Sequence, residues 1–323
     1  MVKAIGLFSG GLDSLLAVRV LQEQGIEVVA VNFVTPFFGP RRASEGARRL
    51  GIPLRVVDIT EEHLRMLRRP RHGYGSQMNP CIDCHSLMLR KARELMEGEG
   101  ASFLFTGEVL GQRPFSQTKE ALRTVDEEAG VVGLVLRPLS ARLLPPTLPE
   151  REGWVRREAL LGIRGRSRRR QMELAKKYGI EGYPSPAGGC LLTDPVYARR
   201  LRDLFEHQEE VSRRDLELLK VGRHLRLSPR VKAIVGRNRG ENERIASLAT
   251  SEDLVLQARD YPGPVVLVPY GGDEELLRAA GVCLRYSDAP LQDRYKVIWR
   301  KGNRSGEVEA APLSPEECER LLL

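Results

Sequence analysis

The sequence has few cysteines and few aromatic residues, and it has no long apolar run. Five of its 323 residues are cysteine and 6% are aromatic. An odd number of cysteines in a chain of this length argues against a disulfide framework. The absence of an apolar run of about 18 residues argues against a membrane-spanning helix. Met1 leads directly into the apolar stretch Ala4–Phe8, with no basic leader, so we expect a cytoplasmic protein with no membrane partner.

The positive charge is concentrated in one short part of the chain. The formal net charge is +8, and residues 151–204 carry 13 basic and 6 acidic side chains. Residues 1–150 carry 19 and 17, and residues 205–323 carry 19 and 20. A local excess of this kind is typical of a binding surface for a polyanion. The length of the chain and the change in residue composition along it predict two domains, residues 1–204 and residues 205–323.

The first third of the chain predicts an α/β fold. Four short apolar runs read as strands, at Ala4–Phe8, Glu27–Phe33, Leu54–Ile59 and Ser102–Thr106. The stretches between them have helical spacing, which predicts a parallel sheet covered by helices. Ligands of such sheets bind at the carboxyl ends of the strands. We therefore expect a site just after Phe8, Phe33 and Phe105.

The last third predicts a smaller, independent α+β domain. It holds four short β-like runs, VKAIVG, LVLQA, PVVLVPY and YKVIWR, separated by Gly, Pro and Asp. Between the two domains, helices are expected at about residues 167–178 and 196–205. Cys283 and Cys318, in this last third, have no motif around them and are expected to be ordinary structural thiols.

The string Ser9-Gly10-Gly11-Leu12-Asp13-Ser14 ends the first predicted strand and begins a helix. Two glycines allow a tight turn that presents backbone N–H groups to an anion, and the helix N-terminus adds partial positive charge. The hydroxyls of Ser9 and Ser14 can contact phosphate oxygens, and Asp13 can hold Mg2+ or orient the reacting groups. This string differs from the P-loop and from the Rossmann glycine motif.

The six-residue string resembles the SGGxDS signature of the PP-loop ATP pyrophosphatases. The resemblance implies a PP-loop domain that binds ATP and Mg2+ and transfers AMP to a carbonyl oxygen. It also implies nucleotide contacts from Asn32 and Phe33 at the end of the second strand and from Thr106 and Gly107 at the end of the fourth.

Three cysteines form a second motif. Cys81 and Cys84 are spaced C-x-x-C, and Cys190 ends the turn-rich string PSPAGGC. Three thiolates suit a 4Fe-4S cluster in which one iron has no protein ligand and can bind hydrosulfide. Two other interpretations stay open. One is a zinc ion with Asp83 or His85 as the fourth ligand, and the other is a cluster-free pair in which Cys84 and Cys190 carry and resolve a persulfide as low-pKa thiolates.

A PP-loop followed by this cysteine pattern resembles the tRNA thiolation enzymes. The strings NPCIDCH, TGEVLGQRPFSQ and GRSRRRQ carry the resemblance to the thiouridine-synthetase-like branch, the tRNA sulfurtransferases. It implies catalytic roles for Asp13, Cys81, Cys84 and Cys190, with tRNA as a partner and inorganic sulfide or a persulfide as the sulfur donor. Residues 235–242 and 254–263 resemble the RNA-binding module of ribosome-quality-control proteins, which implies that the second domain helps to hold tRNA.

Clustered arginines provide the expected RNA contacts. We call residues 163–171, IRGRSRRRQ, the arginine segment; its members expected to bind RNA phosphates are Arg164, Arg166, Arg168, Arg169 and Arg170. In the second domain, a patch of Arg223, Arg226, Arg230, Lys232, Arg237 and Arg239 is expected to do the same.

These observations predict an ATP-dependent tRNA thiolation enzyme. A pyrimidine carbonyl is adenylated, and sulfide from the cluster then replaces the oxygen. A PP-loop ligase that incorporates nitrogen would not need three positioned cysteines. A non-catalytic RNA-binding protein with a retained nucleotide fold is the other alternative, and it predicts RNA binding without release of pyrophosphate.

Overall fold

The computed structural model describes residues 2–183 and 190–323, which form two compact units. The units are Met1–Thr193 and Asp194–Leu323. The boundary proposed from the sequence, after residue 204, falls inside helix α8 (Pro195–His207) of the second unit. Residues 184–189 of the string PSPAGGC lie outside the described residues.

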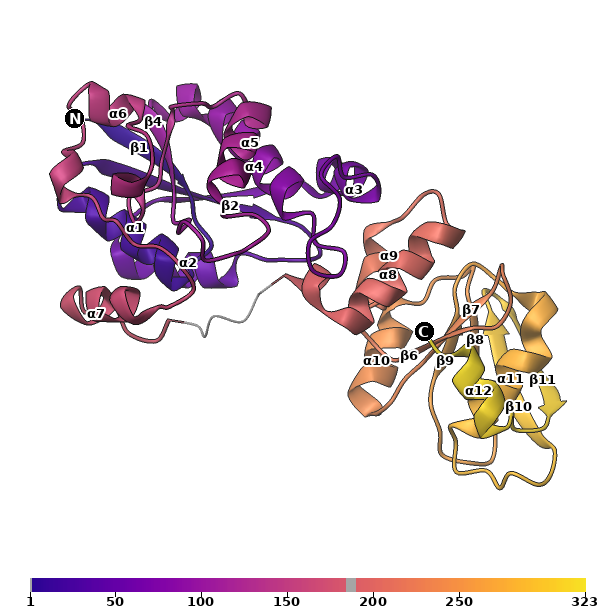
Figure 1. Cartoon of the computed structure of the whole chain (residues 1–323). Coiled ribbons are helices and arrows are strands. Elements are labelled where there is room, and N and C mark those ends of the chain that lie inside the picture. Colours follow the sequence, from indigo (N-terminus) through magenta and orange to yellow (C-terminus); the bar gives the residue numbers. More distant parts are fainter. Residues whose placement is uncertain (1, 184–189) are drawn as a thin grey trace. The chain divides into compact units, whose positions relative to one another are not determined.

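Five parallel strands form the sheet of the first unit, in the order β3-β2-β1-β4-β5 (Figure 1). They are β1 (Lys3–Leu7), β2 (Glu27–Val34), β3 (Leu54–Asp58), β4 (Phe103–Thr106) and β5 (Val135–Leu136). The chain runs outward from β1 to β3 and then returns to place β4 on the other side of β1. The strand order therefore reverses between β1 and β4, which is where ligands of open parallel sheets bind.

Helices cover both faces of this sheet because alternate residues of each strand face opposite sides. Ala4, Val28 and Phe105 pack in one core with helices α1, α2 and α7, while Ile5 and Val29 pack in another with α4 and α5. The helices of this unit are α1 (Leu12–Gln22), α2 (Arg41–Leu50), α3 (Thr60–Arg68), α4 (Cys81–Glu99), α5 (Lys119–Ala129), α6 (Leu148–Arg151) and α7 (Arg169–Lys177), with 3-10 turns η1 (Ala141–Leu143), η2 (Arg157–Ala159) and η3 (Leu191–Thr193).

An antiparallel sheet of six strands forms the second unit, in the order β11-β10-β8-β9-β7-β6. The strands are β6 (Arg223–Arg226), β7 (Lys232–Val235), β8 (Leu254–Ala258), β9 (Val266–Val268), β10 (Tyr295–Lys301) and β11 (Arg304–Ala310). Besides α8, the unit contains α9 (Arg213–Leu218), α10 (Arg239–Leu248), α11 (Leu276–Arg285) and α12 (Pro315–Leu321), with one 3-10 turn, η4 (Asp273–Glu275). Cys283 and Cys318 are buried in its core, as expected for structural thiols.

The predicted fold class is confirmed: a parallel α/β sheet is followed by a smaller α+β unit. The four strands expected in the first third of the chain are present within two residues of their predicted ends. Within the described residues, every helix is too short or too polar to cross a membrane.

Candidate active site

The Gly-Gly loop, residues 9–14, connects β1 to α1 at the point where the strand order reverses. Gly10 has a φ of +71°, and a Cβ atom there would lie 2.1 Å from the backbone oxygen of Arg42. Gly11 caps α1 with no side-chain hydrogen bond. The first N–H groups of the helix therefore remain available to an anion. Within the loop, the Ser14 hydroxyl donates to the Gly11 oxygen at 2.8 Å, and the Ser9 hydroxyl accepts from the Gly11 N–H at 3.3 Å.

The end of β4 packs directly against this loop. A Cβ atom on Gly107 would lie 2.7 Å from the backbone nitrogen of Ser14 and from the carbonyl carbon of Asp13. Only a glycine allows two backbones to approach this closely. Thr106 and Gly107, predicted as nucleotide contacts, are therefore beside the Gly-Gly loop.

Asp13 lies in the first turn of α1, and one of its two carboxylate oxygens has a hydrogen-bond partner among the described residues. Its Oδ2 accepts a hydrogen bond from Gln112 Nε2 at 3.1 Å, while Oδ1 is buried with no hydrogen-bond partner among the described residues. Burial raises the pKa of Asp13, and the nearby Gln112 amide and the charges of Arg168 and Arg113 oppose this rise. An incompletely paired buried carboxylate is a suitable ligand for Mg2+.

Further polar atoms at this edge of the sheet lack partners. Asn32 donates to the Phe8 oxygen at 2.8 Å, but its own Oδ1 is buried and unpaired within the described structure. The same holds for Ser116 Oγ and Gln117 Oε1 in the loop after β4. Phe33, the other predicted contact at the end of β2, is buried. Buried polar groups are rarely left unpaired, so their number here favours a polar ligand such as a nucleotide.

The three predicted thiols gather at one place. Cys81 and Cys84 lie in the first turn of α4, and the charges of both Cys81 and Cys190 affect the pKa of Cys84. The segment after Cys190 is fixed by two backbone hydrogen bonds of 3.1 Å, from Met78 N–H to the Leu192 oxygen and from Leu191 N–H to the Phe37 oxygen. We call Cys81, Cys84 and Cys190 the three-thiol site.

The three-thiol site lies next to the Gly-Gly loop. The positive charge of Arg113, in the loop after β4, acts on Asp13, Cys81 and Cys190 alike. One guanidinium therefore lies within electrostatic range of both sites. The sequence analysis did not select Arg113 as a site residue. Its place in the string TGEVLGQRPFSQ, which follows a predicted nucleotide strand, was the available signal.

The low-pKa thiolates expected for a persulfide pair are not found. Burial raises the pKa of Cys81, raises that of Cys190 to about 11 and raises that of Cys84 well above its usual value. The start of helix α4 does not overcome this effect of burial. A bound cation would reverse it, because coordination favours the thiolate.

The two fourth ligands considered for zinc differ in their other contacts. Asp83 accepts hydrogen bonds from the backbone N–H groups of Arg71 and His72, at 2.8 and 3.1 Å, and Nδ1 of His85 pairs with Glu108 at 2.8 Å. A histidine held by a carboxylate through one ring nitrogen can bind a metal through the other. Among the described residues, the ligand atoms that lie within 4.8 Å of one another belong to His72, Asp83 and Glu128, not to the three thiols. Three thiolates suit a cluster as donors, because thiols that bind different irons stand farther apart than ligands of a single ion.

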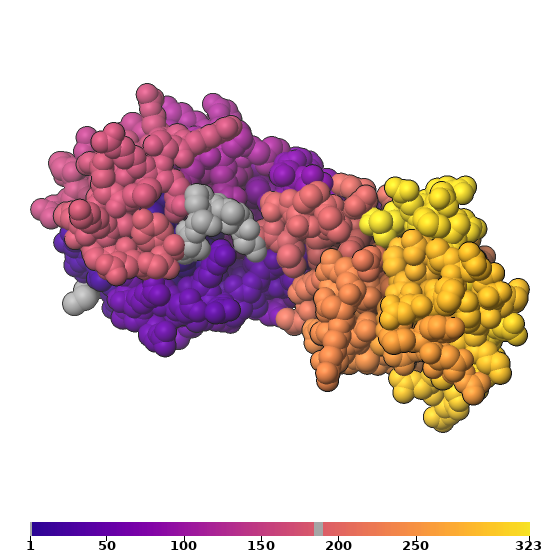
Figure 2. Space-filling view, turned by 90° about the horizontal axis from the view of Figure 1, so that it is seen from below, coloured from indigo at the N-terminus to yellow at the C-terminus, as the bar shows by residue number. Residues whose placement is uncertain are grey.

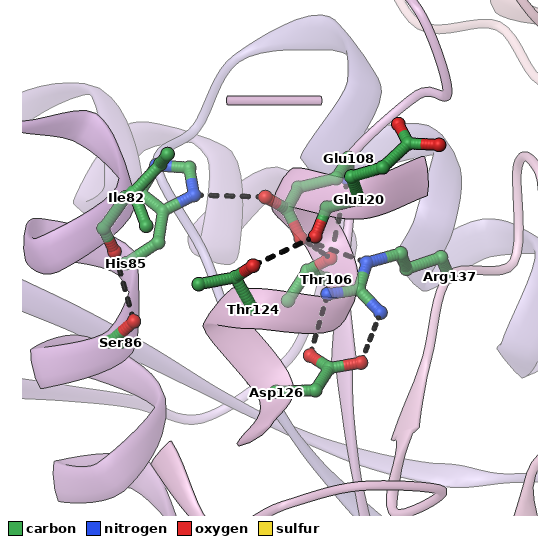
Figure 3. Close-up of polar contacts among 9 residues, drawn as sticks. All are labelled: Ile82, His85, Ser86, Thr106, Glu108, Glu120, Thr124, Asp126 and Arg137. Carbon is green, nitrogen blue, oxygen red and sulfur yellow. Dashed lines mark hydrogen bonds and ion pairs between the residues drawn. The ribbon is translucent and has the colours of Figure 1, made fainter. Parts of the chain in front are cut away.

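A buried ionic network ties the cysteine helix to the nucleotide strand (Figure 3). Glu108, two residues beyond β4, pairs with His85 at 2.8 Å, with the Thr106 hydroxyl at 2.9 Å and with Arg137 at 3.0 Å. Arg137 in turn binds both oxygens of Asp126, at 2.8 and 2.9 Å. Although burial opposes ionisation, Arg137 and the hydrogen bonds from His85 lower the pKa of Glu108 to about 2. The sequence analysis missed this network because its members are far apart in the chain.

The arginine segment runs into α7, which packs in the core that contains α1, and its residues differ in their surroundings. Figure 2 shows the pink residues of this part of the chain beside indigo residues of the N-terminal part. Arg164, Arg166, Arg169 and Arg170 are exposed, whereas Arg168 is half-buried and acts on Asp13. Arg169 and Arg170 share one carboxylate, that of Glu173, at 3.2 and 3.3 Å.

The basic patch expected in the second unit stays a prediction, although four of its six cations pair with carboxylates of the same unit. Arg226 binds both oxygens of the buried Asp203, and Lys232 lies 3.6 Å from the same carboxylate. Arg237 and Arg239 pair with glutamates one turn away in α10. These cations neutralise carboxylates of their own unit, which the sequence pattern did not reveal.

The fold and the site define a class of protein: an α/β domain with a Gly-Gly loop at its strand-order reversal and three thiols near that loop, followed by an antiparallel module. Residues 2–142 match the family described as "Thiamine biosynthesis protein (ThiI)", and residues 222–322 match the family described as "NFACT protein RNA binding domain". Each match covers less than half of the chain.

Curated relatives resemble part of the first unit. A probable tRNA sulfurtransferase of Anoxybacillus flavithermus is 32% identical over 146 residues, 42% of this chain and 35% of the relative. A tRNA-specific 2-thiouridylase, MnmA, of Geobacter metallireducens is 32% identical over 125 residues, 31% of this chain and 33% of the relative. The chain thus spans about a third of the length of these relatives.

Solved structures overlap loosely with the chain. A 4-thiouridine synthetase in complex with RNA and ATP covers 59% of this chain and 42% of its own, with 24% identity and a TM-score of 0.39. A predicted subunit of a tRNA methyltransferase from Methanocaldococcus jannaschii covers 43% of this chain and 68% of its own, with 18% identity and a TM-score of 0.33.

Proposed function

We propose that this protein is an ATP-dependent tRNA sulfurtransferase that converts a pyrimidine of tRNA to its thiolated form, in the cytoplasm. The observation that carries the proposal is the placement of three thiols beside a phosphate-binding loop, with the guanidinium of Arg113 in range of both. The names of the curated relatives and the RNA-binding domain support the same substrate.

Adenylation is the first step of the proposed reaction. The loop glycines and the start of α1 bind the phosphates of ATP, and Asp13 Oδ1, which has no partner among the described residues, would hold Mg2+. The carbonyl oxygen of the pyrimidine bonds to the α-phosphorus, and the bond to the β-phosphate oxygen breaks to release pyrophosphate. Backbone N–H groups and Arg113 stabilise the negative charge that develops on the α-phosphate. Asn32, Phe33, Thr106 and Gly107 line the remaining nucleotide site.

Sulfur transfer is the second step. Sulfide sulfur bonds to the activated carbon, the C–O bond to AMP breaks, and the proton on sulfur is released to solvent. With a persulfide donor, the terminal sulfur bonds to the carbon as the C–O bond breaks, and a second thiol then attacks the donor sulfur, so that the S–S bond to the transferred sulfur breaks and a disulfide forms. Cys81, Cys84 and Cys190 would hold a 4Fe-4S cluster, which supplies, when bound, one iron able to carry hydrosulfide. The charge of Arg113 acts on Cys81 and Cys190 and also on Asp13 of the Gly-Gly loop. In the proposed reaction, both steps therefore use one site. This placement favours sulfur transfer over a nitrogen-incorporating ligase.

The composition of the bound metal tests the cluster independently of activity. Iron and acid-labile sulfide are measured per chain after anaerobic purification of the wild type, Cys190→Ala and, as a matched control, Cys283→Ala from the core of the second unit. We expect about four irons in the wild type and in the control and a large loss in Cys190→Ala. Zinc at about one per chain, with no iron after reconstitution, contradicts the cluster.

The exposed arginines of the arginine segment are proposed to bind tRNA phosphates. Arg164, Arg166, Arg169 and Arg170 point to solvent, and the last two share one carboxylate, so positive charge remains for RNA. Changing Arg169 and Arg170 to Ala is expected to weaken tRNA binding about tenfold at low salt and to reduce its salt dependence by about two counterions. Arg123→Ala, which removes an exposed cation of α5 outside the arginine segment, is the control. Equal affinities of the double variant and the wild type would contradict this surface.

A further inference from the structure

Gln171, in the first turn of α7, is buried in an unusual way. The residue has no exposed surface, and neither its Nε2 nor its Oε1 has a hydrogen-bond partner among the described residues. A buried amide without partners is costly, because it has lost its water and gained nothing in return. A side chain used only for packing at this position would be apolar.

The amide of Gln171 lies beside Asp13. It is close enough to stabilise the charge of the carboxylate, yet the contact does not have hydrogen-bond geometry. Asp13 Oδ1 is unpaired as well, while Oδ2 is held by Gln112 at 3.1 Å. Two buried groups that lack hydrogen-bond partners among the described residues therefore belong to α1 and α7, two helices that pack in one core. A small movement of α7 toward α1 would join them, and each carboxylate oxygen has two lone pairs, which leaves one for a cation.

Helix α7 has two distinct faces. Its inner face buries Gln171, Leu174 and Ala175 in the core that contains α1. Its outer face carries the exposed arginines Arg169 and Arg170. A polyanion that binds the outer face would shift the helix as a unit, and this shift would move the side chain of Gln171.

The segment before α7 is attached to the loop that holds Asp13 from the other side. Gly165 N–H donates to the Leu110 oxygen at 2.8 Å, and Leu110 N–H donates to the Ser140 hydroxyl at 2.9 Å, which donates to the Ile163 oxygen at 2.7 Å. Gln112 follows two residues after Leu110. Asp13 is therefore held between two connected segments, one with Gln112 and one with Gln171.

We propose that Gln171 is a positioning residue for Asp13, whose hydrogen bond to the carboxylate forms when RNA occupies the outer face of α7, so that adenylation depends on bound RNA. This inference rests on the proposed function and concerns the order in which its substrates act. ATP alone binds to an incompletely positioned Asp13, which limits the cleavage of ATP in the absence of RNA.

The decisive variant is Gln171→Met, which keeps the length and volume of the side chain but removes both polar atoms. Release of pyrophosphate from ATP is measured against increasing concentrations of unmodified tRNA, for the wild type, Gln171→Met and Arg169→Ala/Arg170→Ala. We expect Gln171→Met to lower the maximum rate at saturating tRNA by about 10- to 100-fold, with little change in the tRNA concentration for half-maximal rate. Arg169→Ala/Arg170→Ala should raise the tRNA concentration for half-maximal rate and change the maximum rate little.

Thermal unfolding provides a second measurement that does not depend on activity. Trp154 lies in the first unit and Trp299 in the second, so Trp154 fluorescence in a Trp299→Phe background reports on the first unit alone. Because Gln171→Met removes an unpaired buried amide, we expect the Tm of the ATP-free protein to rise by about 2–6 °C. A residue that merely stabilises the fold would lower the Tm when replaced.

The possible results separate the inference from the proposed function. If the wild type releases pyrophosphate and Gln171→Met does so at the same maximum rate, the role of Gln171 is wrong and the proposed function stands. A lowered Tm together with an unchanged response to tRNA also overturns the inference. If the wild type binds tRNA and ATP but releases no pyrophosphate, the proposed function fails, and the inference fails with it.

Discussion

Replacing Glu108 by Gln should destabilise the first unit by an amount that depends on pH. The carboxylate is buried between His85, Thr106 and Arg137 at 2.8–3.0 Å. These partners lower its pKa from 4.5 to about 2. Since one pKa unit equals about 1.4 kcal/mol, the ionised form contributes about 3 kcal/mol to the free energy of unfolding at pH 7. This agrees with the usual cost of about 3–5 kcal/mol for removing one partner of a buried ion pair.

The sign of the pH dependence follows from the lowered pKa. The contribution of Glu108 is complete above about pH 4.5, where the carboxyl is ionised in both folded and unfolded chains. It declines as the pH falls from 4.5 toward 2, because the unfolded chain takes up the proton first. The wild type and Glu108→Gln should therefore differ by about 3 kcal/mol at pH 7 and by much less at pH 3.

The assay is urea unfolding followed by Trp154 fluorescence in the Trp299→Phe background, at several pH values between 7 and 3. Glu127→Gln in the same region serves as the control, since Glu127 is 54% exposed and its pair with Arg123 at 3.6 Å is on the surface; its effect should stay below about 0.5 kcal/mol. A loss for Glu108→Gln below about 1 kcal/mol, or a loss that is the same at pH 7 and pH 3, refutes the reasoning.

Two further changes test other buried charges. Burial among Phe37 and Phe38 lowers the pKa of His63 from 6.5 to about 4. As the pH falls from 6.5 to 4, the unfolded chain therefore binds a proton that the folded chain does not. The first unit should lose about 3 kcal/mol of stability over that range. His63→Phe should remove this part of the pH dependence in the same urea assay, and an unchanged profile would contradict it. In the second unit, Arg226→Ala removes the nearest cation of Asp203 and leaves Lys232 at 3.6 Å and the His207 ring at 3.5 Å. It should cost about 3–5 kcal/mol in urea unfolding followed by Trp299. If Arg226→Ala is as stable as the wild type but binds RNA more weakly, Arg226 belongs to the RNA-binding surface.

Local patterns of the sequence were sufficient for the α/β fold and for the tight Gly-Gly turn between β1 and α1. Both depend on neighbouring residues: apolar runs that alternate with helical spacing, and two glycines between a strand and a helix. Gly10 illustrates this, because its positive φ and the close approach of Arg42 are requirements that only glycine meets at a strand-to-helix turn. The three cysteines were selected by residue type, since few other side chains bind soft metals.

Only the tertiary structure decided which charges remain available and which groups meet. Arg226 and Lys232 read as part of a binding patch along the chain, but Asp203, more than twenty residues earlier, neutralises them. Arg113, Glu108 and Gln171 lie in strings that carry the resemblance, but the strings gave them no role; their roles follow from proximity to Asp13, to the three-thiol site or to α4. A sequence pattern reports the periodicity of one segment, whereas the pairing of a buried charge depends on residues that folding brings together from distant segments.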